Sequence, residues 1–252
     1  MIVSGFLRLA ILPFVAPVVI ARVKIVLSND DGWAVANIRA QHSELVLAGY
    51  NVVLSAPADN RSGTGSSEAE PEPLGADGCQ FESCPPFSPA TGSDPNNPRL
   101  NYVNSFPVTS VRFGIQTAAP PFFGGTGPDL VVAGPNVGNN LGSVVLISGT
   151  VGAATEAAKD SFPSIGQLFP TGECTNPNAF RFVLTRINEA ASDAPADVQT
   201  CGTDRLPTEN SVVAQDGCFV SVCVMNATTK GDVDAATQTF VLRRLGRFLS
   251  CA

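Results

Sequence analysis

Two short apolar segments that flank a helical pattern constrain the fold of this chain more than any other feature. Residues 23–28 and 51–56 are runs of β-branched and aliphatic side chains, which is typical of buried strands. Between them, residues 35–48 carry apolar side chains at helical spacing, and Gly49 ends the pattern. A strand, a helix and a strand in this order predict two parallel strands joined by a right-handed crossover.

The rest of the chain continues the alternation of strands and helices. Residues 57–101 are rich in Gly, Pro, Ser and Asp and are expected to form one long loop. Strands are predicted at 129–133, from 163 onward and at 217–225, and helices at 108–117, 150–160, 178–192 and 232–249. This order predicts an α/β fold, namely a three-layer α/β/α sandwich around a Rossmann-like, mostly parallel sheet.

Composition limits the classes of function. Of the 252 residues, 44% are hydrophobic and 15% are charged, so a sizeable core can form. The formal net charge of −7 argues against nucleic-acid binding, which needs a basic surface.

The N-terminus predicts a secreted protein. An apolar run over residues 9–21 ends in Ala21, with Val19 two positions earlier, as signal peptidase prefers. The alternatives are a membrane anchor and a buried helix, but the run is short for a span and contains Pro13 and Pro17. We therefore expect residues 1–21 to be a signal peptide and no membrane segment to remain after cleavage.

Seven cysteines lie beyond this segment, and an oxidising compartment favours disulfides between them. Cys218 and Cys223 flank a predicted strand that separates them by roughly 16–17 Å, too far for a bridge. The expected pairs are Cys79–Cys84, Cys174–Cys201 and Cys218–Cys251, which leaves Cys223 free. Asn226 begins a glycosylation sequon that follows a strand, so a glycan is expected there.

Polar side chains follow three of the predicted strands. Asp30 and Asp31 end the first, the loop 59–67 follows the second, and Asn136 follows the strand at 129–133. In α/β folds these loops converge at the carboxyl edge of the sheet. The Asp pair alone is equally compatible with a turn or a helix cap. Two adjacent carboxylates repel unless a cation lies between them, and their oxygens suit Mg²⁺, Mn²⁺ or Ca²⁺.

Two further stretches have the composition of an anion site. The loop 134–142 repeats Gly and Asn, and glycines let backbone amides approach a ligand. Ser148, Gly149 and Thr150 open the helix at 150–160, where free amides and hydroxyls attract anions. Simple N-capping by Ser148 or Thr150 is the alternative explanation.

Four ordered motifs together carry a family resemblance over about residues 23–166. They are NDDG after the first strand, APxxxRSGxG after the second, PDLVVxGxNxGxN later, and SGTVGAA at the start of a helix. In this order the chain resembles the SurE-like metal-dependent phosphatases and 5′-nucleotidases. The details NDDGWA and VNSFPV look most like the secreted fungal branch, often described as acid phosphatases.

The resemblance implies a secreted phosphomonoesterase acting on a small phosphomonoester or nucleotide. Asp30 and Asp31 would be catalytic, and with Ser62 and Asn136 they would hold Mg²⁺ or Mn²⁺, Ca²⁺ remaining open. Asn29, Ser148, Gly149 and Thr150 would bind phosphate. It further implies one domain over 22–252, shortened near 166–175 relative to the family, and leaves a homodimer open because relatives commonly dimerise.

Two other readings remain open. One is a catalytically inactive secreted homologue that still binds metal and phosphate. The other is a haloacid-dehalogenase-type phosphatase, which needs Asp-x-Asp at the first strand, whereas residues 30–32 read Asp-Asp-Gly. Asp232 and Asp234 have that spacing but precede a helix, where Asp is a common cap. The single histidine, His42, lies in the first helix and is expected to be a packing or surface residue.

Overall fold

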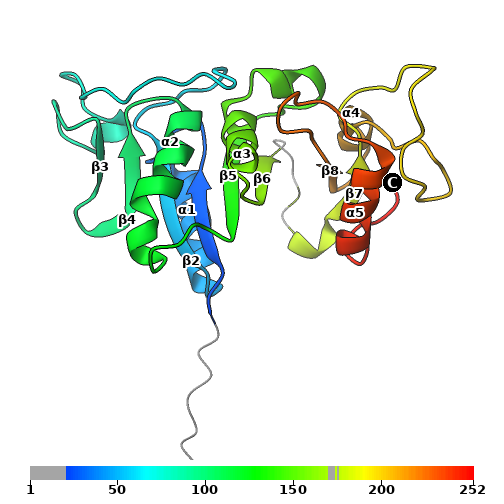
Figure 1. The fold of residues 1–252 in the computed structure, drawn as a ribbon, viewed down its shortest axis with the longest axis horizontal. Helices are drawn as coiled ribbons and strands as arrows, with labels where there is room; N and C mark the ends of the chain where they lie inside the picture. Colours follow the sequence, from blue (N-terminus) through cyan, green and yellow to red (C-terminus); the bar gives the residue numbers. More distant parts are fainter. Residues whose placement is uncertain (1–20, 170–173, 175) are drawn as a thin grey trace, which may run out of the picture.

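The computed structural model describes residues 21–169, 174 and 176–252. Its larger part is a six-stranded sheet with the strand order β3-β4-β2-β1-β5-β6 (Figure 1). The strands are β1 (Lys24–Ser28), β2 (Asn51–Pro57), β3 (Thr91–Asp94), β4 (Asn97–Val103), β5 (Leu130–Val137) and β6 (Ser164–Phe169). All neighbours pair in parallel except β3, which runs antiparallel to β4 at the edge.

Helices cover both faces of this sheet. On one face, α1 (Ala36–Leu47) buries Ile38 against alternate residues of β1 and β2. On the other, α2 (Pro107–Phe113) and α3 (Gly149–Lys159) pack on the remaining residues of the same strands. Side chains of a strand alternate between faces, so β1 feeds both cores. The α/β fold with a mostly parallel, helix-covered sheet is therefore confirmed.

The C-terminal part forms a smaller lobe beside β6 (Figure 1). It contains two parallel strands, β7 (Arg181–Thr185) and β8 (Phe219–Cys223), with α4 (Glu209–Val213) and α5 (Ala235–Leu245). The helix predicted at 178–192 is wrong, because this segment forms β7 instead. Its apolar run is short and bounded by polar residues, so pairing with β8 decides its conformation.

The long loop predicted over 57–101 is wrong at its C-terminal end. Residues 91–103 form the hairpin β3–β4, and β4 joins the sheet as the parallel neighbour of β2. Pro98 and two asparagines hide this strand in the sequence, yet Leu100 and Tyr102 are buried on one face. The strand is specified by its neighbour β2 more than by its own composition.

The disulfides agree with the predicted set of cysteines but not with all of the pairs. Cys79–Cys84 is confirmed, and Cys223 is the described cysteine outside any bridge. The other two pairs were wrong, since Cys174 bonds to Cys218 and Cys201 bonds to Cys251. Cys218 directly precedes β8, and its carbonyl accepts from the Arg181 amide, so the β7–β8 pairing brings it toward the segment before β7.

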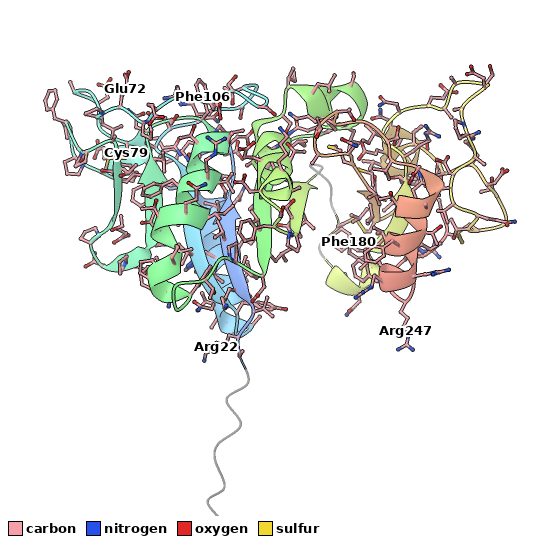
Figure 2. All side chains as sticks on the ribbon, in the orientation of Figure 1. Arg22, Glu72, Cys79, Phe106, Phe180 and Arg247 are labelled. Atoms are coloured by element: carbon pink, nitrogen blue, oxygen red, sulfur yellow. A yellow bond between two sulfur atoms is a disulfide. The ribbon has the colours of Figure 1, made fainter. Side chains whose placement is uncertain are left out.

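The N-terminal prediction falls almost wholly outside the described residues, which begin at Ala21. Across the described ranges, no helix has the length and apolar character that a membrane crossing requires. Figure 2 labels Arg22 at the amino edge of the sheet, opposite Phe106 and Glu72. The latter two mark the edge where the carboxyl ends of the strands meet.

Candidate functional site

A pocket of about 110 Å³ lies at the carboxyl edge of the sheet. The loops after β1 and β2 contribute Asp30 and Ser62, β5 contributes Asn136, and the residue before α3 is Ser148. These side chains are far apart in the sequence and meet because parallel strands end at one edge. Four of the predicted site residues therefore line a single pocket.

Asp30 is almost fully buried and is held from two sides. The Thr150 hydroxyl donates a 2.7 Å hydrogen bond to its Oδ1, so the start of α3 fixes the carboxylate. The Arg61 amide donates to the Asp30 carbonyl over 2.7 Å, which ties the loop after β2 to the same residue. A Cβ on Gly149 would lie 2.8 Å from the Asp30 Cβ, so only glycine allows this approach.

Asp31 is half-buried beside Asp30 and accepts a 3.3 Å hydrogen bond from the Val137 amide. Burial raises the pKa of the Asp31 carboxyl above its usual value, and the charge of Asp30 adds to the rise. Hydrogen bonds from Val137 and Ser62 act in the opposite direction. The carboxylate is thus destabilised by its surroundings as long as no positive charge approaches it.

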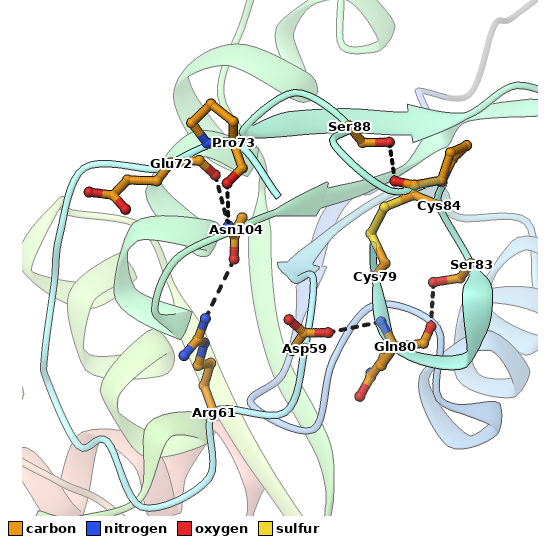
Figure 3. The surroundings of a disulfide bond; sticks show 11 residues. Asp59, Arg61, Glu72, Pro73, Cys79, Gln80, Ser83, Cys84, Ser88 and Asn104 are labelled. Carbon is orange, nitrogen blue, oxygen red and sulfur yellow. Dashed lines mark hydrogen bonds between the residues drawn. A yellow bond between two sulfur atoms is a disulfide. The ribbon is translucent and has the colours of Figure 1, made fainter. Parts of the chain in front are cut away.

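A disulfide loop contacts the backbone of Asp31, and Figure 3 shows the bridge of this loop and the hydrogen bond between Gln80 and Asp59. Cys79–Cys84 closes a short ring, and the Gln80 amide in that ring donates to the Asp59 carboxylate over 2.8 Å. The Gln80 side chain then donates to the Asp31 carbonyl over 3.0 Å. The bridge therefore holds a residue that contacts the Asp pair, although the bridge itself lies outside the pocket.

Asn29 is placed differently from the expected phosphate ligand. Its side-chain amide is buried and exchanges two hydrogen bonds with the Gly32 backbone, at 3.1 and 3.3 Å. Like the predicted site residues Asp31, Gly149 and Thr150, it is not among the residues that line the pocket. Its contacts are those of a residue that shapes the turn carrying Asp30 and Asp31.

The loop after β2 sits directly on α3. The Gly65 amide donates to the Ile147 carbonyl over 2.9 Å, and a Cβ on Gly152 would lie 1.9 Å from the Gly65 carbonyl oxygen. This contact requires glycine at position 152. It brings Ser62 to the pocket, and the Ser62 amide is fixed by the Asn60 side chain at 2.8 Å.

Ser148 has the hydrogen-bond arrangement of an anion donor. Its Oγ accepts from the Val151 amide and from the Asn140 side chain, both at 3.1 Å. A hydroxyl has two lone pairs and one proton, so these two bonds leave its O–H to donate. The first amides of α3, at Gly149 and Thr150, also lack acceptors within the helix. N-capping by Ser148 and anion binding are therefore compatible.

The charge of the site fits a bound cation. Within the described residues, no lysine, arginine or histidine forms an ion pair with Asp30 or Asp31. Two carboxylates, the Ser62 hydroxyl and the Asn136 amide offer oxygen donors, which hard divalent cations prefer. No group of three or more His, Cys, Asp or Glu side chains that could hold a metal occurs in the described part of the chain, this edge included, so a cation here would also need the oxygens of Ser62 and Asn136.

Five residues that line the pocket were absent from the predicted set, among them Gly63 and Asn140, which lie in loops that the sequence analysis singled out. Asn140, which contacts Ser148, was recognisable from the repeated Asn of the glycine loop. The other three are apolar and carry no motif, so only the fold reveals them: Val137, Val144 and Ile147. His42 is buried in α1 and lies outside this pocket, as its predicted packing role requires.

The chain matches a known protein family. A family model described as "Survival protein SurE" matches residues 25–224. The match includes all the motifs at the carboxyl edge and extends through β8.

Two individual relatives each match a little more than half of the chain. An acid phosphatase from Yarrowia lipolytica is 42% identical over 147 residues, which are 58% of this chain and 41% of that protein. The 5′-nucleotidase SurE of Gloeobacter violaceus is 37% identical over 142 residues, or 56% and 48% of the two chains. The chain thus spans about half or less of the length of these two relatives.

A third relative and a solved structure are also similar to this chain. The 5′-nucleotidase SurE of Treponema pallidum is 30% identical over 182 residues, which cover 69% of this chain and 86% of that protein. A crystal structure of the SurE protein from Aquifex aeolicus has 30% sequence identity and a TM-score of 0.45, covering 60% of this chain and 52% of that one.

Proposed function

The chain belongs to the SurE family, and from that premise we propose that it is a secreted, metal-dependent phosphomonoesterase of the acid phosphatase or 5′-nucleotidase type. One observation carries the proposal. Asp30, which is buried, and Asp31, which is half-buried, form no ion pair and lie at one edge with the free Ser148 hydroxyl proton and the amino end of α3. A cation site and an anion site side by side suit a phosphate ester.

The residues that would hold the cation are Asp30, Asp31, Ser62 and Asn136. Mg²⁺ or Mn²⁺ suits this set of oxygens, and Ca²⁺ fits the same chemistry. A divalent ion here would polarise the phosphoryl group and lower the pKa of a water at the site.

The chain's own residues would bind and orient the ester. The Ser148 hydroxyl and the α3 amides would donate to phosphoryl oxygens, since the helix N-terminus stabilises negative charge. Thr150 donates to Asp30 and thereby fixes its orientation. Asp31 is the more exposed of the pair, so it is the better candidate for proton transfer or attack.

The test is hydrolysis of p-nitrophenyl phosphate with Mn²⁺ or Mg²⁺, with EDTA, and by the variant Asp31→Asn. We expect EDTA to abolish turnover and the substitution to lower kcat/KM by about 10²-fold or more. Asp77→Asn, on an exposed loop, is the matched control and should keep wild-type activity. Metal-free Asp31→Asn should remain folded, because it removes the repulsion from Asp30.

A second candidate function is metal and phosphate binding without turnover. Asp31, the group proposed for proton transfer or attack, is not among the residues that line the pocket, and this favours the second candidate. Calorimetric titration with Mn²⁺ separates the two. If the wild type binds Mn²⁺ without hydrolysing the ester, and Asp31→Asn loses that binding, the protein is a binding protein and not an enzyme. Absence of both would contradict the proposed site altogether.

Secretion and glycosylation are part of the same proposal. Three disulfides among the described residues support an oxidising compartment. Asn226 and Asn60 are both exposed, and each accepts the amide of the residue two positions later, but Ser62 of the Asn60 sequon lines the pocket, where a glycan would crowd the site. We therefore propose a glycan on Asn226 and none on Asn60. The homodimer and the single domain over 22–252 stay predictions.

A further inference from the structure

Large apolar side chains are exposed around the mouth of the site pocket. Val137, Val144, Leu146 and Ile147 have exposed fractions of 59%, 38%, 55% and 58%. Three of them, Val137, Val144 and Ile147, line the pocket itself and are called the apolar rim below. Exposed apolar groups that cluster beside polar site groups mark binding surfaces more often than accidents of folding.

The backbone beneath the rim is anchored, so these side chains cannot withdraw into the core. Val145, between Val144 and Leu146, is buried against Ile187 and Val151. The Ile147 carbonyl accepts from the Gly65 amide at 2.9 Å. With Val145 directed inward, its neighbours in the short helical turn Gly142–Leu146 necessarily face outward. The exposure of the rim is therefore built into the fold.

The charge of the pocket lining also favours an apolar ligand group over an anionic one. Asp30 is the one ionisable side chain among the described residues that line the pocket. No lysine, arginine or histidine of that lining is present to meet a second phosphate or another anionic group. A chain of phosphates would place uncompensated negative charge against this surface, whereas an apolar group would bury area on the rim.

We propose that the apolar rim binds the leaving group of the substrate and selects phosphomonoesters of aromatic alcohols over those of small polar alcohols and over polyphosphate. The proposal rests on the proposed function, because it places the phosphate at Ser148 and the cation at the Asp pair. Val137, Val144 and Ile147 would then be specificity-determining residues.

The first test compares benzyl phosphate with ethyl phosphate, whose alkoxide leaving groups have similar basicity. We expect kcat/KM to favour benzyl phosphate by about 10-fold or more, because a hydrophobic contact of this size has that effect on specificity. Val144→Ser and Ile147→Ser should each lower the benzyl-to-ethyl ratio by about 3- to 10-fold. Val46→Ser is the matched control, since Val46 is 45% exposed at the C-terminal end of α1 and does not line the pocket.

The second test uses binding and so separates the rim from catalysis. In the presence of Mn²⁺, phenylphosphonate should bind more tightly than methylphosphonate in calorimetry, and the rim variants should reduce the difference. If neither ester is hydrolysed but this preference holds, the proposed enzyme fails and the rim assignment stands.

Two results would overturn the assignment. One is an equal preference for aromatic and aliphatic ligands that the rim variants leave unchanged. The other is a shift from dimer to monomer in sedimentation of Val144→Ser and Ile147→Ser with an unaltered benzyl-to-ethyl ratio. That second result would make the rim an interface between two copies of the chain.

Discussion

At the scale of residues, the site depends on how one buried carboxylate is held. Asp30 receives the Thr150 hydroxyl at 2.7 Å and has Gly149 against its side chain. These contacts join β1 to α3 and leave the second oxygen of Asp30 for a ligand. A hydrogen bond to a buried charged group contributes more than one between neutral groups.

Thr150→Val should therefore destabilise the metal-free protein. The substitution keeps the shape of the side chain but removes the donor to Asp30, so we expect the free energy of unfolding to fall by about 1.5–3 kcal/mol. Urea denaturation in the presence of EDTA measures this change in the free energy of unfolding. Thr150→Ser keeps the hydroxyl and is the matched control. A Thr150→Val protein as stable as the wild type would show that the hydrogen bond contributes nothing.

Residues with distinctive chemistry were recognisable from the sequence, and residues with ordinary chemistry were not. Asp30, Asp31, Ser62 and Asn136 stand in motifs of rare composition. Val144 and Ile147 are common apolar residues, and nothing in their neighbours tells whether they face the core or the pocket. Even Asn29, inside the NDDG motif, makes its two hydrogen bonds to the Gly32 backbone, which the residue type alone does not reveal.

At the scale of elements, the glycine loop is tied to the C-terminal lobe by Glu209 at the start of α4. Its carboxylate is buried and accepts from the Gly142 amide over 3.0 Å. Burial raises the pKa of the Glu209 carboxyl, and Asp232 adds to the rise, while Cys223 and Gly142 oppose it. The Cys223 thiol has its own pKa raised well above the usual value by burial, so it stays neutral.

This arrangement predicts a pH dependence of stability. Because the folded pKa of Glu209 lies above the ordinary 4.5, the folded protein keeps a proton there that the unfolded chain has lost. The free energy of unfolding therefore falls as pH rises from about 4.5 through the raised pKa. Glu209→Gln has no carboxyl group to titrate at this position. The difference between its free energy of unfolding and that of the wild type should therefore shift in favour of the variant over the same pH range.

Urea denaturation at several pH values measures the difference. Glu70→Gln, on an exposed loop, is the control and should track the wild type at every pH. Glu209→Ala should be less stable throughout, because it leaves the buried Gly142 amide without its acceptor. A constant difference between Glu209→Gln and the wild type would contradict the raised pKa.

Elements with a strong local pattern were predictable, and elements that depend on a partner strand were not. β1, α1, β2 and α3 each combine the right period with clear end signals. By contrast, β4 contains a proline, and the apolar residues at 180, 183, 184 and 187 around β7 also fit a helical period. Strand formation there depends on pairing with β2 and β8, which lie far away in the sequence.

At the scale of the whole molecule, the two lobes meet at the segment that carries the pocket. Val145 and Val151 of the larger part pack with Ile187, Cys223 and Met225 of the smaller one. The Lys230 amino group also donates to the Leu146 carbonyl at 3.4 Å. The C-terminal lobe therefore supports the glycine loop and the rim from behind.

Mass spectrometry of the protein secreted by an expressing cell should find three features together. The chain should begin at Arg22, and non-reduced peptides should join Cys174 to Cys218 and Cys201 to Cys251. Asn226 should carry the glycan. The measurement compares peptide maps recorded before and after treatment with a glycosidase and with a reductant. A peptide joining Cys174 to Cys201 would contradict the arrangement of the C-terminal lobe.

The sequence by itself determined the order of the first elements, the carboxyl-edge motifs and the set of bridged cysteines, because each depends on local pattern or residue chemistry. The tertiary structure alone decided the β7–β8 pairing, two disulfide pairs and the apolar rim. These depend on contacts between distant segments, where many arrangements satisfy the same local preferences. The free energy that selects one arrangement comes from apolar surface buried between segments of both lobes. No single stretch of the sequence specifies that burial.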